Sequence, residues 1–136
     1  MQKINHGAIW TVVVLAQLIP AGWYGLFQEP WMRYNDLSEA YITEQQTATP
    51  FIVSIIASAI FAYVLAWVFR RMQIDSALGG FTAAVLMGFA FLLLPLMVQN
   101  LFSFRPYPLT WIDGGASLVI WAVAGLLLGG WRKYAA

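Results

Sequence analysis

Cysteine and charge are what this sequence has least of. None of its 136 residues is cysteine, which excludes disulfide bonds, thiolate nucleophiles and thiolate metal sites. Charged residues make up 10% of the chain, where soluble proteins carry about a quarter, and the formal net charge is only +1. Because a nucleic-acid partner calls for a basic patch, we expect no nucleic acid among the partners of this protein.

Histidine is also scarce, since His6 is the only one in the chain. A histidine in this place fits an axial ligand or a pH sensor. No second histidine and no carboxylate lies near it in the sequence, so we expect it to bond to water or a lipid headgroup. Phosphate-binding glycine loops, nucleophile motifs and metal-ligand spacings are missing too, and the sequence predicts no metal, no cofactor and no catalytic residue.

Hydrophobic residues are what the chain has instead. They supply 61% of the sequence, and the mean hydropathy is +0.71. A helix needs about 20 apolar residues to cross the hydrocarbon core of a bilayer, and the chain has room for four such runs. The sequence predicts an all-α membrane protein, a single domain over residues 1–136 that forms a four-helix transmembrane bundle. The predicted spans are residues 4–27, 51–69, 77–98 and 111–131.

The connection between the first two spans, residues 28–49, is the only one long enough to hold structure of its own. Aromatic and apolar residues recur in it at spacings of three and four, namely Trp31, Tyr34, Leu37 and Tyr41. This spacing favours a short helix that lies in the headgroup layer, and a polar loop anchored by Trp31 fits the composition equally well. The sequence alone leaves both a short interfacial helix and a loop open.

Lysine and arginine are divided unequally between the two sides of the predicted bundle. Four spans place Arg33 and Arg105 on one side, which we call outer, and all the other basic residues on the opposite side. Basic residues in short flanks are retained in the cytoplasm, so both chain ends are predicted to be cytoplasmic. The basic residues of that side are Lys3, Arg70, Arg71, Arg132 and Lys133.

Small residues follow three of the four predicted spans at intervals of four, a spacing that lets helix backbones approach closely in a membrane. These ridges either close a monomeric bundle or face another copy of the chain, and the last span is the first candidate for an intersubunit face. The sequence thus predicts membrane lipids and either a homo-oligomer or a membrane-protein partner. The ridge residues are Ser54, Ser58, Gly80, Ala84, Gly88, Gly125 and Gly129.

The middle of the bilayer is predicted to hold almost no polar group. Gln17 is the one strongly polar side chain deep in a span, and no carboxylate, histidine or lysine lies at that depth. Because polar groups inside a membrane are functional candidates, Gln17 is a candidate site residue. Pro20 and Pro95 interrupt the first and third spans, where each marks either a hinge or a static kink.

Polar and aromatic side chains collect instead at the outer ends of the spans. Asp113 is predicted to cap the last helix together with Thr110 and to pair with Arg105, while Asn100 is predicted to bond loop carbonyls. A helix cap, a snorkelling arginine and an aromatic belt explain the same residues without any ligand. With a ligand they form a candidate outer pocket of Trp23, Tyr24, Gln28, Trp31, Gln99, Asn100, Arg105, Trp111 and Asp113.

Several of these residues fall in short motifs that follow one another in a distinctive order: "GWYGLF" (22–27), "PWM" (30–32) and "VQNLFSFRPYPLTWIDGG" (98–115). The set resembles the bacterial membrane family known as domain of unknown function 1761, over essentially the whole chain. One departure is Gly114-Gly115, where the family pattern would place an aromatic residue second. The resemblance implies a four-span protein of the bacterial inner membrane and supplies no activity. Its marks are Trp23-Tyr24-Gly25, Trp31-Met32, Asn100, Arg105-Pro106 and Ile112-Asp113.

Three functions remain open on the sequence. The first is a non-catalytic accessory, assembly or lipid-binding module, which the apolar bilayer centre favours. The second is a homo-oligomeric carrier or channel for a small solute, with Gln17, Pro20 and Pro95 along its path. The third is a membrane enzyme at the outer interface that uses Asp113 as acid or base, and it lacks a second acid-base group.

Overall fold

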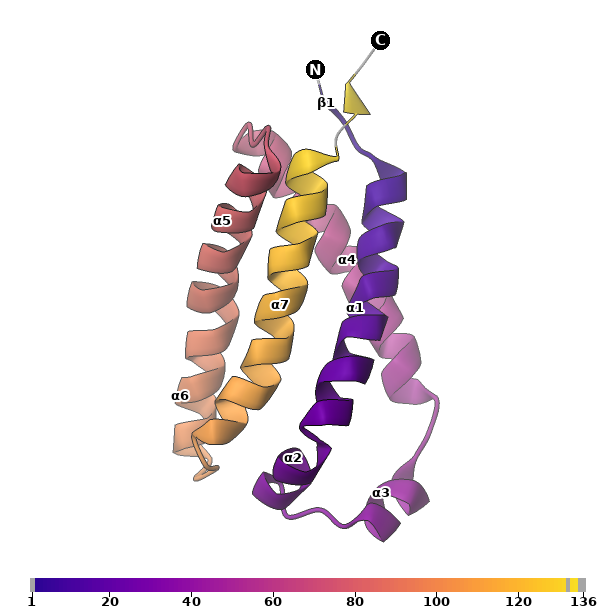
Figure 1. Cartoon of the computed structure of the whole chain (residues 1–136), viewed down its shortest axis with the longest axis vertical. Coiled ribbons are helices and arrows are strands. Elements are labelled where there is room, and N and C mark those ends of the chain that lie inside the picture. Colours follow the sequence, from indigo (N-terminus) through magenta and orange to yellow (C-terminus); the bar gives the residue numbers. More distant parts are fainter. Residues whose placement is uncertain (1, 132, 135–136) are drawn as a thin grey trace.

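The computed structural model describes residues 2–131 and 133–134. Four of its helical segments are long and apolar enough to cross a membrane, which confirms the predicted all-α fold with four spans (Figure 1). The first, second and fourth of these segments are single helices, whereas the third consists of three helical pieces that follow one another directly. The spans are α1 (His6–Leu26), α4 (Thr49–Arg71), the series α5 (Ala77–Gly88), η1 (Phe89–Leu93) and α6 (Leu94–Phe102), and α7 (Pro108–Gly130).

Both chain ends lie at one end of the bundle. The two-residue strands β1 (Gln2–Lys3) and β2 (Lys133–Tyr134) pair there in antiparallel fashion, with Gln2 opposite Tyr134 (Figure 1). Asn5 reinforces this junction, because its side chain caps α1 at the Ala8 N–H and donates to the carbonyl oxygen of Trp131. We call this the terminal end of the bundle and the opposite one the outer end.

The connection at the outer end contains two short helices, α2 (Gln28–Tyr34) and α3 (Glu39–Gln45), rather than the one that the aromatic spacing predicts. The break falls at Asp36, which has a φ of 55° and closes α2 with backbone hydrogen bonds to the last turn. Ser38 then caps α3 by accepting from the Tyr41 N–H at 3.2 Å. Trp31 and Tyr41 therefore lie on different helices.

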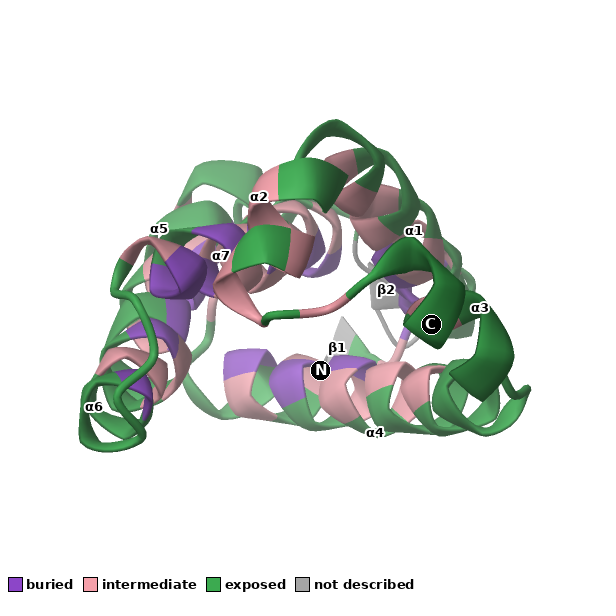
Figure 2. Cartoon of the chain, turned by 90° about the horizontal axis from the view of Figure 1, so that it is seen from below, coloured by how far each residue is buried: buried purple, intermediate pink, exposed green. Residues whose placement is uncertain are grey.

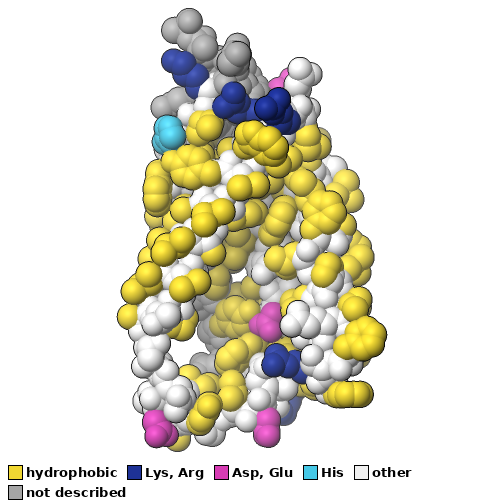
Figure 3. All heavy atoms as spheres, turned by 180° about the vertical axis from the view of Figure 1, so that it is seen from behind, with side chains coloured by type: hydrophobic (Ala, Val, Ile, Leu, Met, Phe, Trp, Pro, Cys, Tyr) yellow, Lys and Arg dark blue, Asp and Glu magenta, His cyan; other side chains and the backbone are white. Residues whose placement is uncertain are grey.

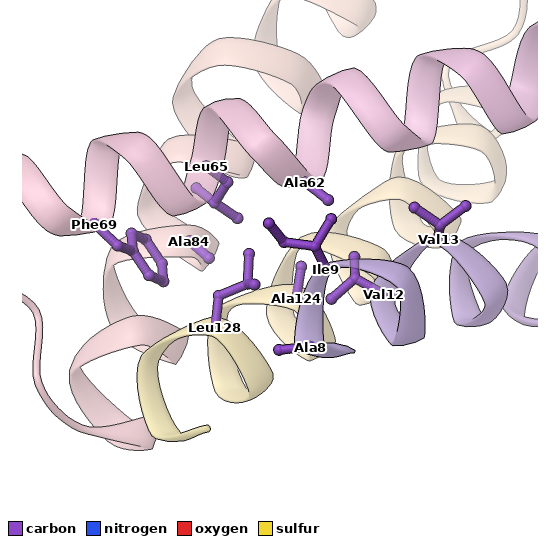
Figure 4. Close-up of a cluster of buried hydrophobic side chains, with 10 residues drawn as sticks. All are labelled: Ala8, Ile9, Val12, Val13, Ala62, Leu65, Phe69, Ala84, Ala124 and Leu128. Carbon is purple, nitrogen blue, oxygen red and sulfur yellow. The ribbon is translucent and has the colours of Figure 1, made fainter. Parts of the chain in front are cut away.

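The hydrophobic core lies in the half of the bundle nearest the terminal end. Side chains from α1, α4, α5 and α7 meet there, with Ile9 fully buried at the centre. Figure 4 shows α1 contributing its first turns, and α4 and α7 their last turns, to this contact. The cluster consists of Ala8, Ile9, Val12, Val13, Ala62, Leu65, Phe69, Ala84, Ala124 and Leu128.

The outer half of the bundle is packed differently. Among the described residues, none of α1 after Ala16 and none of α4 before Ala62 is buried. Leu93 and Leu109, in contrast, are fully buried where η1 and α6 lie against α7. Viewed from the outer end, α4 runs along one side while α5, α6 and α7 gather on the other (Figure 2). The outer halves of α1 and α4 thus contribute little to the core.

Glycine permits a close helix contact between α5 and α7. A Cβ added to Gly80 would lie 2.9 Å from the Cα of Gly129, and one added to Gly125 would lie 2.6 Å from the Cβ of Ala84. Gly88 similarly lies under the ring of Trp121. The small ridge of the last span is therefore occupied within the chain, and the interpretation of Gly125 and Gly129 as an intersubunit face is wrong.

The third span departs from α-helical geometry just before Pro95. Residues 89–93 form the π-helical turn η1, in which the Leu94 N–H bonds to the carbonyl of Phe89. Proline lacks the N–H that an α-helix would use here, and its ring crowds the preceding turn, so a wider turn accommodates it. Leu93, inside this turn, contacts Gly114 of α7, which leaves space for it by having no side chain.

Candidate functional site

Three aromatic side chains fasten the corner between α1 and α2 onto the start of α7. Trp23 donates its indole N–H to the carbonyl oxygen of Ile112 at 2.8 Å. Tyr24 donates its hydroxyl to Oδ1 of Asp113 at 2.6 Å, and Trp31 donates its indole N–H to the same oxygen at 3.1 Å. We call Trp23, Tyr24 and Trp31 the aromatic clamp.

The rings of the clamp are also packed against one another and against α7. Tyr24 and Trp31 meet edge to face with centroids 5.9 Å apart, and Trp23 lies on Phe27 at 5.0 Å. The indole of Trp23 covers Gly115, where an added Cβ would lie only 2.8 Å from the ring. The aromatic residue that the resemblance implies at position 115 would not fit this packing, because the ring of Trp23 fills the space beside Gly115.

Two residues of the clamp, Tyr24 and Trp31, line a cavity of about 530 Å³ at the outer end. The space-filling view in Figure 3 shows the molecule hollowed in the half away from the chain ends, with an acidic side chain next to a basic one amid hydrophobic atoms. Helices α1, α2, α3 and α7 and the turn after α6 all contribute to it. We call it the outer cavity, lined by Tyr24, Gly25, Gln28, Trp31, Asn35, Ile42, Arg105 and Asp113.

Arg105 reaches the outer cavity from the turn that ends α6. Phe104 has a φ of 58°, and the N–H of Arg105 bonds to the carbonyl of Asn100 at 2.9 Å, which is the pattern of a Schellman motif. This backbone bond fixes where the Arg105 side chain starts. No described residue makes an ion pair, hydrogen bond or cation–π contact with its guanidinium.

The predicted roles of Asp113 and Arg105 are therefore wrong in part. Asp113 does not pair with Arg105 in the described chain, and the side chains that bond to its carboxylate are Tyr24 and Trp31. Nor does it cap the last helix with Thr110, because α7 begins at Pro108 and both residues lie inside it. Asp113 instead holds three helices together through its carboxylate, and charge-assisted hydrogen bonds of this kind are stronger than neutral ones.

Four of the nine outer candidates do not line the outer cavity. Asn100 is buried, and its side-chain amide donates to the hydroxyl of Thr110 at 2.9 Å, so it ties α6 to α7 rather than to loop carbonyls. Gln99 and Trp111 are exposed on the outside of the bundle. Trp23 lies behind the cavity, against α7. Tyr24, Gln28, Trp31, Arg105 and Asp113 are brought together.

Three cavity residues escaped sequence reasoning. In the sequence, Gly25 is notable only as part of the Trp23-Tyr24-Gly25 motif. In the structure it lines the cavity, where its missing side chain leaves open space beside α1. Asn35 and Ile42 lie in the connection whose helices break at Asp36, and their approach to α7 depends on that break. The usable signal was Ile42, one of the few aliphatic residues in the connection between the first two spans.

Gln17, the candidate in the middle of the membrane, is bonded to α4. Its amide nitrogen donates to the hydroxyl of Ser58 at 3.0 Å, and the hydroxyl of Ser54 donates to its amide oxygen at 2.9 Å. The amide nitrogen also reaches the carbonyl of Val13 at 3.3 Å. Two residues of the predicted small ridge thus face α1 and satisfy its glutamine, which is how polar groups join helices in membranes.

The described residues provide few groups for acid-base catalysis or metal binding. The Nδ1 of His6 lies 2.8 Å from the hydroxyl of Tyr63, at the terminal end and away from Asp113. Within residues 2–131 and 133–134, no three His, Asp or Glu side chains gather as a metal site requires. The arrangement at the outer cavity offers instead a cation, a carboxylate and aromatic rings, which are groups that recognise a ligand.

Comparison with known proteins identifies a family. A family model described as Protein of unknown function (DUF1761) matches residues 8–129, which is most of the chain. This match confirms the resemblance drawn from the motifs. Several of the residues that carry that resemblance belong to the clamp or accept its hydrogen bonds, namely Trp23, Tyr24, Trp31, Ile112 and Asp113. No curated protein and no solved structure matches the chain.

Proposed function

The chain belongs to the family described as Protein of unknown function (DUF1761), and we propose that this member is a non-catalytic membrane protein that binds a lipid in its outer cavity. The observation that carries the proposal is the cavity itself. It has a volume of about 530 Å³, which is within the range of small-molecule sites, and it combines apolar and aromatic walls with a few polar groups. Its place at the end of the spans is the level of the lipid headgroups.

The splayed outer half of the bundle supports a lipid rather than a soluble ligand. The outer parts of α1 and α4 have no buried residue among those described, so their apolar side chains face hydrocarbon close to the cavity. A lipid can therefore place its headgroup in the cavity and its acyl chains along these helices. A soluble solute would gain nothing from that apolar surface.

A carrier or a channel has less support. Gln17, the polar group on its proposed path, is bonded on both sides of its amide to Ser54 and Ser58. A solute would have to break these bonds in an apolar surrounding, where unsatisfied polar groups are costly. An enzyme also has less support, since Asp113 has two structural partners and no described histidine, lysine or second carboxylate lines the cavity with it.

The test fills the cavity without disturbing the fold. An added Cβ at Gly25, which lines the cavity, meets nothing within 4 Å, and the same holds for Gly22 of the same helix, which does not line it. We expect Gly25→Leu to lower lipid occupancy by roughly tenfold because its side chain takes up ligand space, which corresponds to about 1.4 kcal/mol of binding free energy. Gly22→Leu is the matched control and should bind as the parent does.

The measurement is native mass spectrometry of the purified protein with a bacterial lipid extract. Thermal unfolding of each variant, followed in the same detergent, shows that the fold is intact. Equal lipid occupancy in Gly25→Leu and in the parent would place the lipid elsewhere and contradict the proposal.

We further propose the setting of the molecule. The positive-inside rule and the family resemblance support a multi-pass protein of the bacterial inner membrane with both ends in the cytoplasm. Lys3, Arg70 and Arg71 all lie toward the terminal end, near the paired strands. A homo-oligomer or a membrane-protein partner stays a prediction, and the exposed outer half of α4 offers a surface for it.

A further inference from the structure

Two opposite charges face the outer cavity without neutralising each other. Arg105 and Asp113 both line it, yet they form no ion pair within the described chain. Arg105 is exposed and Asp113 is partly buried, so both charges are open to a ligand in the cavity. A ligand that carries both charges would neutralise both side chains.

Asp113 uses only half of its carboxylate on the protein. Oδ1 accepts from both Tyr24 and Trp31, whereas no described residue donates to Oδ2. No buried side-chain oxygen or nitrogen of the described chain is left without a partner, so Oδ2 is not sealed inside. The carboxylate is therefore held in position by one oxygen and presents the other to the cavity.

The wall beside Asp113 also fits a cation. The rings of Tyr24 and Trp31 line the cavity next to the carboxylate that they bind. Aromatic faces attract ammonium groups, most strongly where water is partly excluded. An amine at this place would thus meet a carboxylate and two rings together.

Another part of the cavity lining fits an anion. The guanidinium of Arg105 has no partner among the described residues, and its planar donors match the geometry of a phosphate. Gln28 and Asn35 add neutral amides to the same lining. A phosphate at Arg105 and an amine at Asp113 belong to one headgroup when the lipid is zwitterionic.

We infer that the outer cavity selects a phospholipid whose headgroup carries a primary amine beside its phosphate. The inference rests on the proposed lipid-binding function and names the lipid class. A phospholipid with an anionic, amine-free headgroup leaves Asp113 uncompensated and meets an outer side where acidic residues outnumber basic ones. These acidic residues are Glu29, Asp36, Glu39, Glu44 and Asp113.

The experiment is a competition followed by native mass spectrometry on the full-length protein. Phosphatidylethanolamine and phosphatidylglycerol with identical acyl chains are offered in equal amounts, and soluble phosphoethanolamine is added in a separate arm. We expect the parent to prefer phosphatidylethanolamine by about tenfold. Soluble phosphoethanolamine, which lacks acyl chains, should displace neither lipid.

Two variants assign the preference to the two charges. Asp113→Asn keeps an oxygen for Tyr24 and Trp31 and removes the charge, so it should bind both lipids about equally. Arg105→Gln should weaken both lipids by a similar factor, because both carry a phosphate. The controls are Glu44→Gln and Arg33→Gln, which remove exposed outer charges that do not line the cavity and should keep the preference of the parent.

Equal binding of the two lipids by the parent, with Gly25→Leu losing both, would overturn the headgroup inference and leave lipid binding in place. Binding of neither lipid would overturn both proposals. Displacement by soluble phosphoethanolamine at the concentrations of the lipids would identify a free molecule as the ligand and contradict the lipid assignment. If Asp113→Asn still preferred phosphatidylethanolamine over phosphatidylglycerol, the carboxylate of Asp113 would not be the group that recognises the amine.

Discussion

At the scale of single residues, Asp113 has two roles, because it joins helices by hydrogen bonds and also lines the outer cavity with Arg105. Its carboxylate accepts hydrogen bonds from Tyr24 of α1 and Trp31 of α2. The carbonyl of the neighbouring residue Ile112 accepts a hydrogen bond from Trp23 of α1. A carboxylate is acceptor-only when ionised and has two oxygens, so one residue can join structure and still present an oxygen to a ligand. Few other side chains offer both.

Phe104 offers a test of how the turn that carries Arg105 is built. A bulky residue at a φ of 58° is strained by its Cβ, at a cost of roughly 1–2 kcal/mol, and its side chain is 95% exposed. We expect Phe104→Gly to raise the free energy of unfolding by about 1 kcal/mol, because glycine adopts this conformation without strain. Thermal unfolding in detergent measures the change.

The matched control is Phe102, which is also largely exposed but lies in α6. Phe102→Gly should lower the free energy of unfolding by about 1 kcal/mol, since glycine is a poor helix former. If Phe104→Gly lowered the free energy of unfolding by a similar amount, the contacts of the Phe104 ring would stabilise the turn by more than the backbone strain destabilises it.

At the scale of helices, the spans are joined by two kinds of contact. Bare glycine backbones bring α5 and α7 together, with Gly80 against Gly125 and Gly129. Hydrogen bonds join α1 to α4 through Gln17 and to α7 through the aromatic clamp. Membrane helices gain little from the hydrophobic effect on association, so close packing and hydrogen bonding have to hold them.

Gly125→Ala tests the glycine contact. The new methyl group would meet Ala84 at 2.6 Å and the backbone of Gly80, and neither can move without shifting a helix. We expect the free energy of unfolding to fall by about 1–3 kcal/mol, the usual cost of overpacking. Thermal unfolding of the purified protein measures it.

Gly22→Ala provides the comparison for that test, because an added Cβ there meets nothing within 4 Å. Alanine is the better helix former, so this variant should gain about 0.5–1 kcal/mol. A loss of stability in Gly22→Ala as large as that in Gly125→Ala would argue against a contact specific to α5 and α7.

At the scale of the whole molecule, the core and the cavity divide the bundle. Packed side chains fill the terminal half, and the outer half is held by the clamp and by the contact of α6 with α7. This division leaves space for a ligand at one end while the other end keeps the helices together. Among the described residues, Lys3, Arg70 and Arg71 lie at the packed end, whereas Arg33, Arg105 and most of the acidic residues lie at the open end.

The orientation of the molecule is tested with reporter fusions. Green fluorescent protein fused to the C-terminus should fluoresce, because it folds in the cytoplasm, and alkaline phosphatase at the same position should be inactive. Alkaline phosphatase fused after Gln46, beyond α3, should be active, since that connection lies at the outer end. The opposite pattern of activities would reverse the assignment of the two sides.

Sequence reasoning could reach the helices but not the partners of their side chains. The apolar runs mark the four spans to within a few residues, although the last helix starts at Pro108 rather than 111. The π-helical turn before Pro95 adds a residue to one turn, which rotates everything after it by about 100° relative to a regular helix. The regular period of an α-helix, about 3.6 residues per turn, therefore does not predict that Asn100 faces Thr110 of α7.

The sequence by itself determined that the chain is a four-span bundle, because the length and apolarity of each run follow from the thickness of a bilayer. It also determined which polar groups are scarce enough to matter. Only the tertiary structure decided that Asp113 bonds to Tyr24 and Trp31, while Arg105 lines the same cavity and has no partner among the described residues. Those residues are far apart in the chain, and contacts between them depend on how helices pack, which local sequence does not specify.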